Sequence, residues 1–526
     1  MKKNIFKILI IAAPALILAS CTDLDIYPEN TSSSEVVFST LEGTQGALAK
    51  VYGAYSLTGN SGPGGKTDLP IPGVDEGQNA DFLRTWFNHQ ELPTEEAHCL
   101  WNDPGLPELN TIRFTADGRF TSGLYYRVIM QIMYANEFIR NAKEDLGAEV
   151  RTYKAEARFI RAFDYWVLMD IFGNPPFVTE DDATGILPQQ TNSKDLFAYI
   201  ESELKDIADN GLLKAPRANV YGRADQAAAW ALLARLYLNA EVYTGTARYA
   251  DAATYSKKVI DAGYSLMANY EHLFLADNDQ NNPEMILPIA YDGDKTRTNG
   301  GVTFLIKCTF SDAYLNTYGS TVIAEGLYVN AFWSGYRTRK ELNDKFEAGD
   351  KRRLLVGANP ALGQSPNTYE NGLMVYKYRN IKSGSTYGNI IPSTSGNEEF
   401  ADTDFPLFRL AEQYLIYAEC AARGAAQKSE ALGYVNQLRN RAGVSTISEA
   451  QLTPQFILDE RARELYWECF RRTDLIRYGL FTTATYTWEW KGGVQTGQEV
   501  DAHYNIYPIP ASDLNSNTNL NQNPKY

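Results

Sequence analysis

The sequence of 526 residues predicts a mainly α-helical fold, a scaffold of divergent tetratricopeptide-type helical pairs that carries large irregular, loop-rich excursions. Three observations predict it. Helical periodicity of apolar residues recurs in two blocks, at about 122–263 and 408–479. Small residues stand where neighbouring helices would cross. Two further stretches, about 30–120 and 264–405, are rich in Gly, Asn, Thr, Pro and Tyr and carry only short apolar runs.

The first block predicts five helices, which span 124–143, 150–172, 193–211, 224–240 and 249–262. On the first of them, apolar residues recur at spacings of four, three and four: Val128, Ile132, Ala135 and Ile139. The Gly-Asn-Pro-Pro sequence at 173–176 ends the second helix. Ser193 is the expected N-cap of the third helix, and Gly211 ends it. The fourth is dense in alanine and can therefore approach its neighbour closely.

The second block predicts helices over 409–422, 429–441 and 454–478. The regular period of tetratricopeptide repeats is not kept, so we expect interrupted units. The last helix carries Glu460, Arg463, Glu464, Arg471 and Asp474, which could be mistaken for a catalytic cluster. Spacings of three and four residues favour structural ion pairs instead.

The N-terminus resembles a lipoprotein signal. Lys2 and Lys3 precede an apolar run over 5–18, and the run ends in the sequence Leu-Ala-Ser-Cys at 18–21. The run is too short for an ordinary membrane span. A cysteine at this point resembles a bacterial lipobox, so we expect residues 1–20 to be removed and Cys21 to carry lipid. An ordinary secretory signal with an incidental cysteine is the alternative.

Charge and composition narrow the classes of function. A net charge of −15 and the lack of a basic stripe argue against a nucleic-acid partner. The remaining cysteines are widely spaced and predict four separate buried thiols: Cys99, Cys308, Cys420 and Cys469. The four histidines are scattered as well, so we expect neither a metal site nor a cofactor. The 34 tyrosines suit a surface that binds neutral, polar ligands.

The two irregular stretches are the expected place of function, because binding residues are commonly carried by loops on a rigid scaffold. Decorative surface loops are the alternative, and composition does not separate the two.

Several motifs, in this order along the chain, resemble those of the RagB/SusD family. They are ELPTEE at 91–96, RFIRA at 158–162, FGNPP at 172–176, DERAREL at 459–465, RRTDLIR at 471–477, YPIP at 507–510 and NQNPKY at 521–526. The Pro-Ile-Pro stretch of the tail is most simply a rigid strap over the helices.

This resemblance implies a function. It describes residues 21–526 as a non-catalytic glycan-binding domain, anchored by lipid to the outer membrane and facing the cell exterior. The domain would capture oligosaccharide or polysaccharide and deliver it to a SusC-like TonB-dependent transporter. The helical blocks would form the scaffold, and the irregular stretches would carry the sugar site.

A sugar site needs an aromatic ring for the C–H face of the pyranose or furanose and polar groups for its hydroxyls. The segment 75–103 supplies both kinds of group. By the family resemblance, Asp75 and Arg84 correspond to hydroxyl-binding residues and Trp101 to a stacking ring. Either Asn102 or Asp103 corresponds to the amide beside that ring, because the match requires a one-residue deletion there.

A second ring is expected at Trp333, in a Phe-Trp-Ser-Gly segment that resembles a Gly-Trp segment of the family. Asn299 stands where the starch-binding member has a tyrosine, which weakens any inference to a helical α-glucan. Arg379 is a further polar candidate on loop position alone. For any single tryptophan, core packing is the alternative.

Two other classes of function compete. A surface glycosidase needs two carboxylates on facing elements at a set separation. Glu95 and Glu96 are sequence neighbours and cannot both face one ligand from an extended stretch. A surface lipoprotein that captures a peptide or another non-glycan nutrient is the second alternative, because the wider family includes such relatives.

Overall fold

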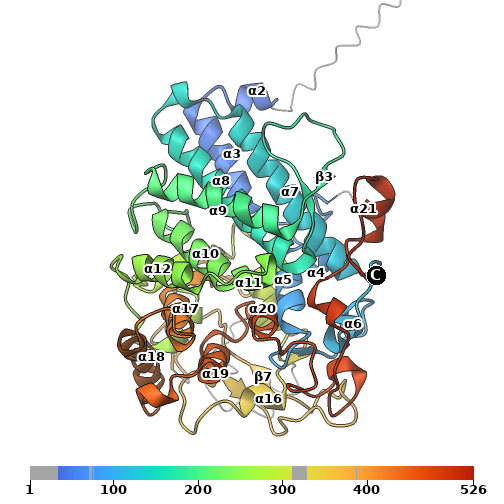
Figure 1. Ribbon diagram of the computed structural model, residues 1–526, viewed down its shortest axis with the longest axis vertical. Coiled ribbons are helices and arrows are strands. Elements are labelled where there is room, and N and C mark those ends of the chain that lie inside the picture. The colour runs from blue at the N-terminus through green and yellow to red at the C-terminus, as the bar shows by residue number, and fades with distance from the viewer. Residues whose placement is uncertain (1–32, 70, 72–73, 75, 311–328, 387) are drawn as a thin grey trace, which may run out of the picture.

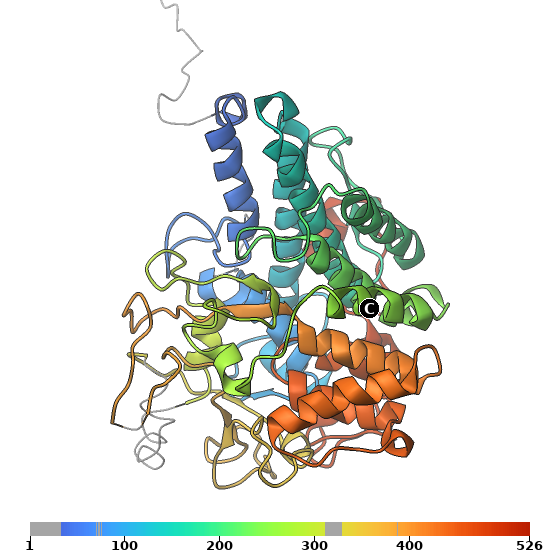
Figure 2. The ribbon, with the colours of Figure 1, turned by 90° about the vertical axis from the view of Figure 1, so that its left-hand side faces the viewer.

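The computed structural model describes residues 33–526 except 70, 72–73, 75, 311–328 and 387. The expected signal peptide at 1–20, Cys21 and Asp75 lie outside the described residues. The fold is mainly helical, as predicted (Figure 1). In a view turned by 90°, the helices of the second block lie on one side of the molecule, and much of the 264–405 stretch lies on the other (Figure 2).

All five predicted helices of the first block are present: α7 (Arg119–Asn141), α8 (Glu149–Phe172), α9 (Ser193–Asp209), α10 (Gln226–Leu238) and α12 (Tyr249–Ile260). Consecutive helices pack against one another, with α7 on α8, α8 on α9 and α10 on α12. The alanines of α10 are buried, which lets α12 approach closely. The expected cap of α9 was wrong by one residue. The Asn192 side chain accepts the backbone N–H of Asp195 at 3.0 Å, and Ser193 is the first helical residue.

The second block contains α17 (Leu410–Ala422), α18 (Lys428–Ala442), α19 (Pro454–Leu465) and α20 (Arg471–Arg477). The prediction of one helix over 454–478 was wrong, because the chain turns between α19 and α20. Trp467 and Cys469 have φ angles of 62° and 66° there. The indole Nε1 of Trp467 donates to the carbonyl of Glu96 at 2.9 Å. This bond spans 371 residues of sequence, and such tertiary contacts override local helical periodicity.

The two stretches expected to lack helical pattern also contain helices: α2 (Ser34–Val37), α3 (Leu41–Gly53), α4 (Glu76–Asn79), α5 (Phe82–Glu91), α6 (Leu106–Thr111), α13 (Gly301–Lys307) and α16 (Lys340–Asn343). Every residue of α5 is buried, the polar ones included, although its apolar residues Phe82, Leu83, Trp86 and Phe87 recur at helical spacing. Two short helices lie outside these stretches, α11 (Ala240–Thr244) and α21 (Ala511–Ser516).

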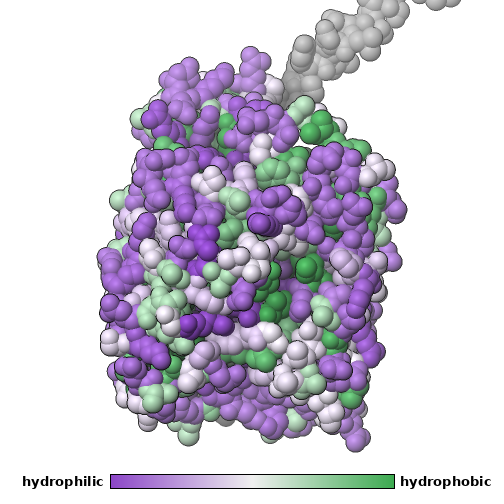
Figure 3. All heavy atoms as spheres, viewed as in Figure 1, coloured by the Kyte–Doolittle hydropathy of each residue, from purple (hydrophilic) through white to green (hydrophobic). Residues whose placement is uncertain are grey.

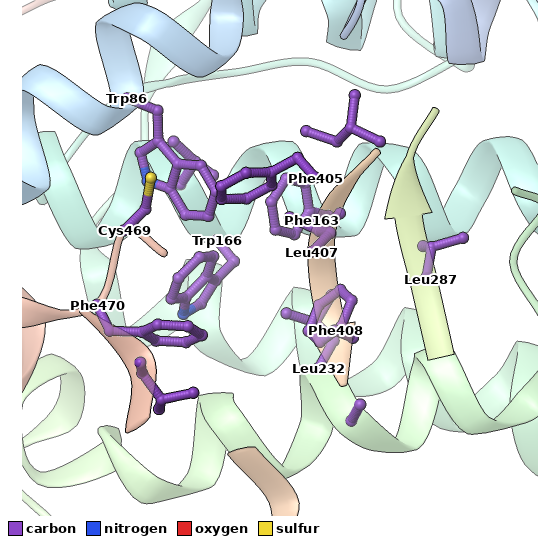
Figure 4. Close-up of a cluster of buried hydrophobic side chains, with 14 of the residues drawn as sticks. Trp86, Phe163, Trp166, Leu232, Leu287, Phe405, Leu407, Phe408, Cys469 and Phe470 are labelled. Carbon is purple, nitrogen blue, oxygen red and sulfur yellow. The ribbon is translucent and has the colours of Figure 1, made fainter. Parts of the chain in front are cut away.

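The strands of the described residues form four antiparallel pairs: β1 (His98–Cys99) with β5 (Tyr336–Arg337), β2 (Pro176–Phe177) with β3 (Gln189–Gln190), β4 (Met285–Ile289) with β8 (Phe405–Arg409), and β6 (Leu355–Val356) with β7 (Met374–Val375). The β4–β8 pair is fully buried. Phe408 of β8 meets Phe163 of α8 edge-on, with ring centroids 6.1 Å apart, and Figure 4 shows both side chains. This pair therefore attaches the 264–405 stretch to the helical scaffold.

A buried ion cluster joins the second block to the 264–405 stretch. Glu464 pairs with Arg409 at 2.7 Å, with Arg352 at 3.4 Å and with Arg441. Burial alone would raise the pKa of Glu464, but the three guanidinium groups outweigh it and lower that pKa to about 2. The predicted structural ion pairs are confirmed, although most partners are distant in sequence. Glu460 with Arg463 is a pair of the expected spacing, at 2.6 Å.

The C-terminal tail is a strap, as predicted. The backbone N–H of Tyr507 donates to the carbonyl of Ile171 at 2.8 Å. The Asn523 side chain donates to the carbonyls of Phe172 and Tyr507, at 2.8 and 2.7 Å. These bonds hold the tail against the end of α8.

The four cysteines expected as buried thiols are buried and free. Among the described residues, no helix combines the length and the apolar composition that crossing a bilayer requires. Polar residues cover most of the face seen in Figure 3, and apolar residues form small groups between them.

Candidate functional site

The β1–β5 pair brings two distant segments together. His98 pairs with Arg337 and Cys99 with Tyr336 in antiparallel register. The pairing continues past the strands, since the backbone N–H of Leu100 donates to the carbonyl of Gly335 at 2.7 Å. The residues that follow β1 therefore lie beside those that precede β5.

Trp101 is held at this junction. Its indole N–H donates to the carbonyl of Ser334 at 2.7 Å, across 233 residues of sequence. Tyr336 meets the ring edge-on, with centroids 5.3 Å apart. The indole is half-buried. Because its N–H is used inside the protein, the ring offers mainly its apolar surface to a ligand.

Gly335 allows this close packing. A Cβ atom built on Gly335 would lie 2.3 Å from the indole Nε1 of Trp101. The preceding residue, Ser334, has a φ of 39°, which is uncommon for a residue with a side chain. Arg337 contacts this turn, because its Nη2 donates to the Ser334 hydroxyl at 3.1 Å.

Arg84 of α5 lies against the same tryptophan. Its guanidinium carbon is 5.6 Å from the centroid of Trp101 and 4.3 Å from that of Phe304 on α13. Asp81 joins these two helices, since its carboxylate accepts the backbone N–H of Arg84 at 2.8 Å and that of Gly301 at 3.0 Å. The buried Arg84 thus supports the ring by cation–π contact.

Trp333 directly precedes Ser334 in the chain. Its backbone N–H donates to the carbonyl of Lys307 at 2.8 Å, and the Lys307 ammonium lies 5.5 Å from its ring centroid. Burial lowers the pKa of Lys307. The Trp333 ring is half-buried, as the Trp101 ring is. The structure therefore brings the two predicted rings into one region.

Both candidates for the polar residue beside Trp101 are exposed. The Asn102 side-chain oxygen accepts a hydrogen bond from the Asn367 amide at 3.1 Å. The Asp103 backbone carbonyl accepts the N–H of Leu106 at 3.0 Å. Asn102 and Asp103 both stay candidates for a ligand contact.

Asn299 and Arg379 belong to other segments of the chain than the two rings. Asn299 is half-buried and stands just before the N-terminus of α13. Lys307, whose carbonyl accepts the backbone N–H of Trp333, is the last residue of this helix. Arg379 is buried, and its guanidinium pairs with Glu271 at 2.6 Å. The roles of these two residues stay predictions, as does that of Asp75, which lies outside the described residues.

Sequence reasoning missed three residues that shape the site: Lys307, Tyr336 and Arg337. The Ser-Gly sequence at 334–335 was a usable signal, because glycine often marks a close approach of another group. The three missed residues carry no comparable signal, since their roles depend on segments far apart in sequence.

A cavity of about 320 Å³ lies elsewhere, between α3 and the end of β4. Tyr52, Tyr55 and Tyr221 contribute to its lining, and none of the predicted site residues does. The site around Trp101 and Trp333 is a surface platform of rings and polar groups. Such a platform can cover the apolar face of a polar ligand and hydrogen-bond the ligand's edge.

Two family models and a full-length relative match this chain. A family model described as "SusD family" matches residues 277–526, and one described as "Starch-binding associating with outer membrane" matches residues 108–238. The starch-binding protein SusD of Bacteroides thetaiotaomicron is 37% identical, over 100% of this chain and 99% of that protein.

Solved structures share the fold. The surface glycan-binding protein A of Bacteroides thetaiotaomicron superposes with a TM-score of 0.70 at 20% identity, over 93% of this chain and 100% of that one. A SusD superfamily protein of Parabacteroides distasonis gives a TM-score of 0.69 at 21% identity, with the same coverage. With a full-length relative at 37% identity, and with the helical architecture in common, the chain belongs to the SusD family.

Proposed function

We propose that this protein is a non-catalytic, lipid-anchored protein of the outer membrane that binds oligosaccharide or polysaccharide outside the cell. It passes the glycan to a SusC-like TonB-dependent transporter. One observation carries the proposal: two half-buried tryptophans from segments far apart in sequence meet at Ser334, since Trp101 donates to the Ser334 carbonyl and Trp333 directly precedes Ser334. The relative at 37% identity is named a starch-binding protein, which supports a glycan as the ligand.

The carboxyl groups near the site support binding without hydrolysis. Glu95 is fully buried and pairs with Arg471 at 2.5 Å. Glu96 is also buried, and its carboxylate accepts the backbone N–H of Trp467 at 3.2 Å. Both groups are thus used inside the protein. Asp103 is exposed beside Trp101, but a glycosidase needs a second carboxyl group facing it.

Anchoring and partnership can be tested separately from binding. Replacement of Cys21 (Cys21→Ser) would move the protein from the membrane fraction to the soluble fraction, since lipid on Cys21 is the proposed anchor. Gentle solubilisation of membranes should co-purify the protein with a large outer-membrane barrel. Solitary behaviour would count against the transporter partnership.

Glycan binding is tested by native affinity electrophoresis of residues 22–526 against a panel of polysaccharides. The expected result is retardation by at least one polysaccharide, and loss of that retardation in Trp101→Ala. Trp230→Ala is the matched control. Trp230 is a half-buried tryptophan on α10, where Lys258 lies 5.5 Å from its ring, and its loss should leave retardation unchanged.

A second candidate ligand is a peptide or another non-glycan nutrient. Retardation by no polysaccharide, together with binding of peptide, would replace the glycan proposal with this one. Shortening of a polysaccharide during incubation, detected by chromatography, would instead revive an enzymatic function.

A further inference from the structure

The loop formed by residues 362–371 lies against the platform of Trp101 and Trp333. Its Asn367 amide donates to the side-chain oxygen of Asn102 at 3.1 Å, directly after Trp101 in the chain. Pro366 and Asn367 also face the buried ring of His98 on β1. No residue of this loop belongs to the expected glycan contacts.

A second connection passes through Arg337. Its Nη2 donates to the Ser334 hydroxyl at 3.1 Å and to the backbone carbonyl of Tyr369 at 3.3 Å. Since the Ser334 carbonyl accepts the Trp101 indole N–H, one guanidinium group joins the turn that holds Trp101 to the loop that carries Tyr369. Tyr369 is therefore a near neighbour of the platform, although the two are far apart in sequence.

The 362–371 loop is held at its base. The Glu489 carboxylate accepts the backbone N–H groups of Leu362 and Gly363, at 2.6 and 3.1 Å. The Trp490 indole donates to the carbonyl of Gly363 at 3.0 Å, and the Asn371 amide donates to that of Leu362 at 2.9 Å. A loop that is already ordered loses little conformational entropy when a ligand binds to it.

Tyr369 stands out on this loop because its side chain is exposed. It keeps 44% of its accessible surface, which places it among the most exposed large apolar residues of the described chain. Asn367 is exposed as well. A ring and an amide on one ordered loop are the two kinds of group that a sugar residue requires.

We propose that the 362–371 loop extends the glycan site by a further sugar-binding position. Tyr369 covers the C–H face of a sugar residue, and Asn367, together with Asn102, hydrogen-bonds its hydroxyls. This inference rests on the proposed glycan-binding function. It makes the ligand a neutral oligosaccharide that is longer than the segment in contact with Trp101 and Trp333.

The test is calorimetric titration of residues 22–526 with linear oligosaccharides of increasing length, prepared from whichever polysaccharide retards the protein. In Tyr369→Ala, affinity for the longer oligosaccharides should fall about fivefold, because one ring–sugar contact is lost. Affinity for the shortest that binds should stay unchanged. Tyr369→Phe keeps the ring and should bind all lengths as the wild type does. Circular dichroism confirms that both variants are folded.

The outcomes separate failure of the loop from failure of the function. If Tyr369→Ala binds every length as tightly as the wild type, while Trp101→Ala loses binding, Tyr369 is an incidental surface tyrosine and the inference is overturned. An equal loss at every length also overturns it, since no added position exists. If the wild type binds no glycan, the proposed function fails and the inference fails with it.

Discussion

Gly335 and Trp101 are in such close contact that no side chain fits between them. A Cβ atom on Gly335 would lie 2.3 Å from the indole nitrogen, a separation that real Cβ atoms do not reach. The position of the Trp101 ring thus depends on a residue that itself offers no side chain to a ligand.

Gly335→Ala should therefore weaken glycan binding as strongly as Trp101→Ala does, because the added methyl group displaces the indole. Affinity electrophoresis measures the loss. Gly433→Ala is the control. Gly433 is an exposed residue of α18, and a Cβ atom there would meet nothing within 4 Å. It should keep binding and raise the free energy of unfolding by up to about 1 kcal/mol. Unchanged binding in Gly335→Ala would show that the ring position is unimportant.

Replacement of Arg409 should destabilise the protein severely. Arg409 is buried and pairs with Glu284 at 2.8 Å and with Glu464 and Glu468 at 2.7 Å. Arg409→Met leaves three buried carboxylates without this partner, and we expect a loss of about 3–5 kcal/mol in the free energy of unfolding. Urea denaturation measures it.

The control for Arg409 is Arg151→Ala. Arg151 and Glu144 form an exposed pair at 3.3 Å, which should contribute less than about 1 kcal/mol. Similar losses in the free energy of unfolding for Arg409→Met and Arg151→Ala would contradict the expectation that a buried ion pair matters more to stability than an exposed one.

Asp404 should make stability depend on pH near neutrality. Its carboxyl group accepts the N–H of Tyr291 and the hydroxyl of Tyr221, both at 2.7 Å. Burial raises the pKa of Asp404 from 3.8 to about 7. The folded state therefore keeps a proton that the unfolded state releases at lower pH. This stabilisation is complete below about pH 4 and is lost as pH rises to about 7, at about 1.4 kcal/mol per pH unit.

Asp404→Asn removes the titration. Its oxygen can accept the N–H of Tyr291, and its amide can donate to the Tyr221 hydroxyl, which reverses that bond. Urea denaturation of the wild type and the variant between about pH 5 and pH 7 should give a smaller decline with rising pH for the variant. Other buried carboxyl groups, such as Glu91, are common to both proteins and cancel in the comparison. Parallel curves would mean that Asp404 titrates at its ordinary pKa.

Loss of the Asn523 side chain should loosen the C-terminal strap. Asn523→Ala leaves the buried carbonyl of Tyr507 without its donor, at a cost of about 1–3 kcal/mol, while the carbonyl of Phe172 still accepts the backbone N–H of Asn174. Thermal unfolding measures the shift. Asn515→Ala, at an exposed position on α21, should unfold like the wild type. Equal melting temperatures for Asn523→Ala and Asn515→Ala would show that the hydrogen bonds of the Asn523 side chain contribute no stability.

Local sequence predicted the regular helices well. An amphipathic helix such as α9 is predictable from sequence because its buried residues, among them Leu204 and Ile207, recur every three or four positions. The break between α19 and α20 could not be predicted, because Glu96 holds Trp467 from 371 residues away. α5 was missed although its apolar residues recur at helical spacing, because this short helix stands within a stretch that is otherwise rich in Gly, Asn, Thr, Pro and Tyr.

The candidate site was predictable only in part. The family resemblance nominated Trp101 and Trp333, and the structure brings them together through Ser334. Arg379 pairs with Glu271, and its role in the site stays a prediction. Tyr369 carried no signal in the sequence. Its place beside the platform depends on Arg337, which connects the loop to Ser334, and this contact cannot be read from local sequence.

The ion cluster around Glu464 limits which sequence segments can be exchanged between this protein and its relatives. Arg352 belongs to the 264–405 stretch, Arg409 to β8 and Arg441 to α18, yet all three neutralise one carboxylate. A chimera that replaced 264–405 with the counterpart from a relative would have to supply Arg352 together with Asp350 and Glu284, the two carboxylates of this stretch that pair with Arg352 and Arg409. New sugar specificities in this lineage would therefore arise more readily by changes within surface loops such as 362–371 than by the transplantation of whole segments.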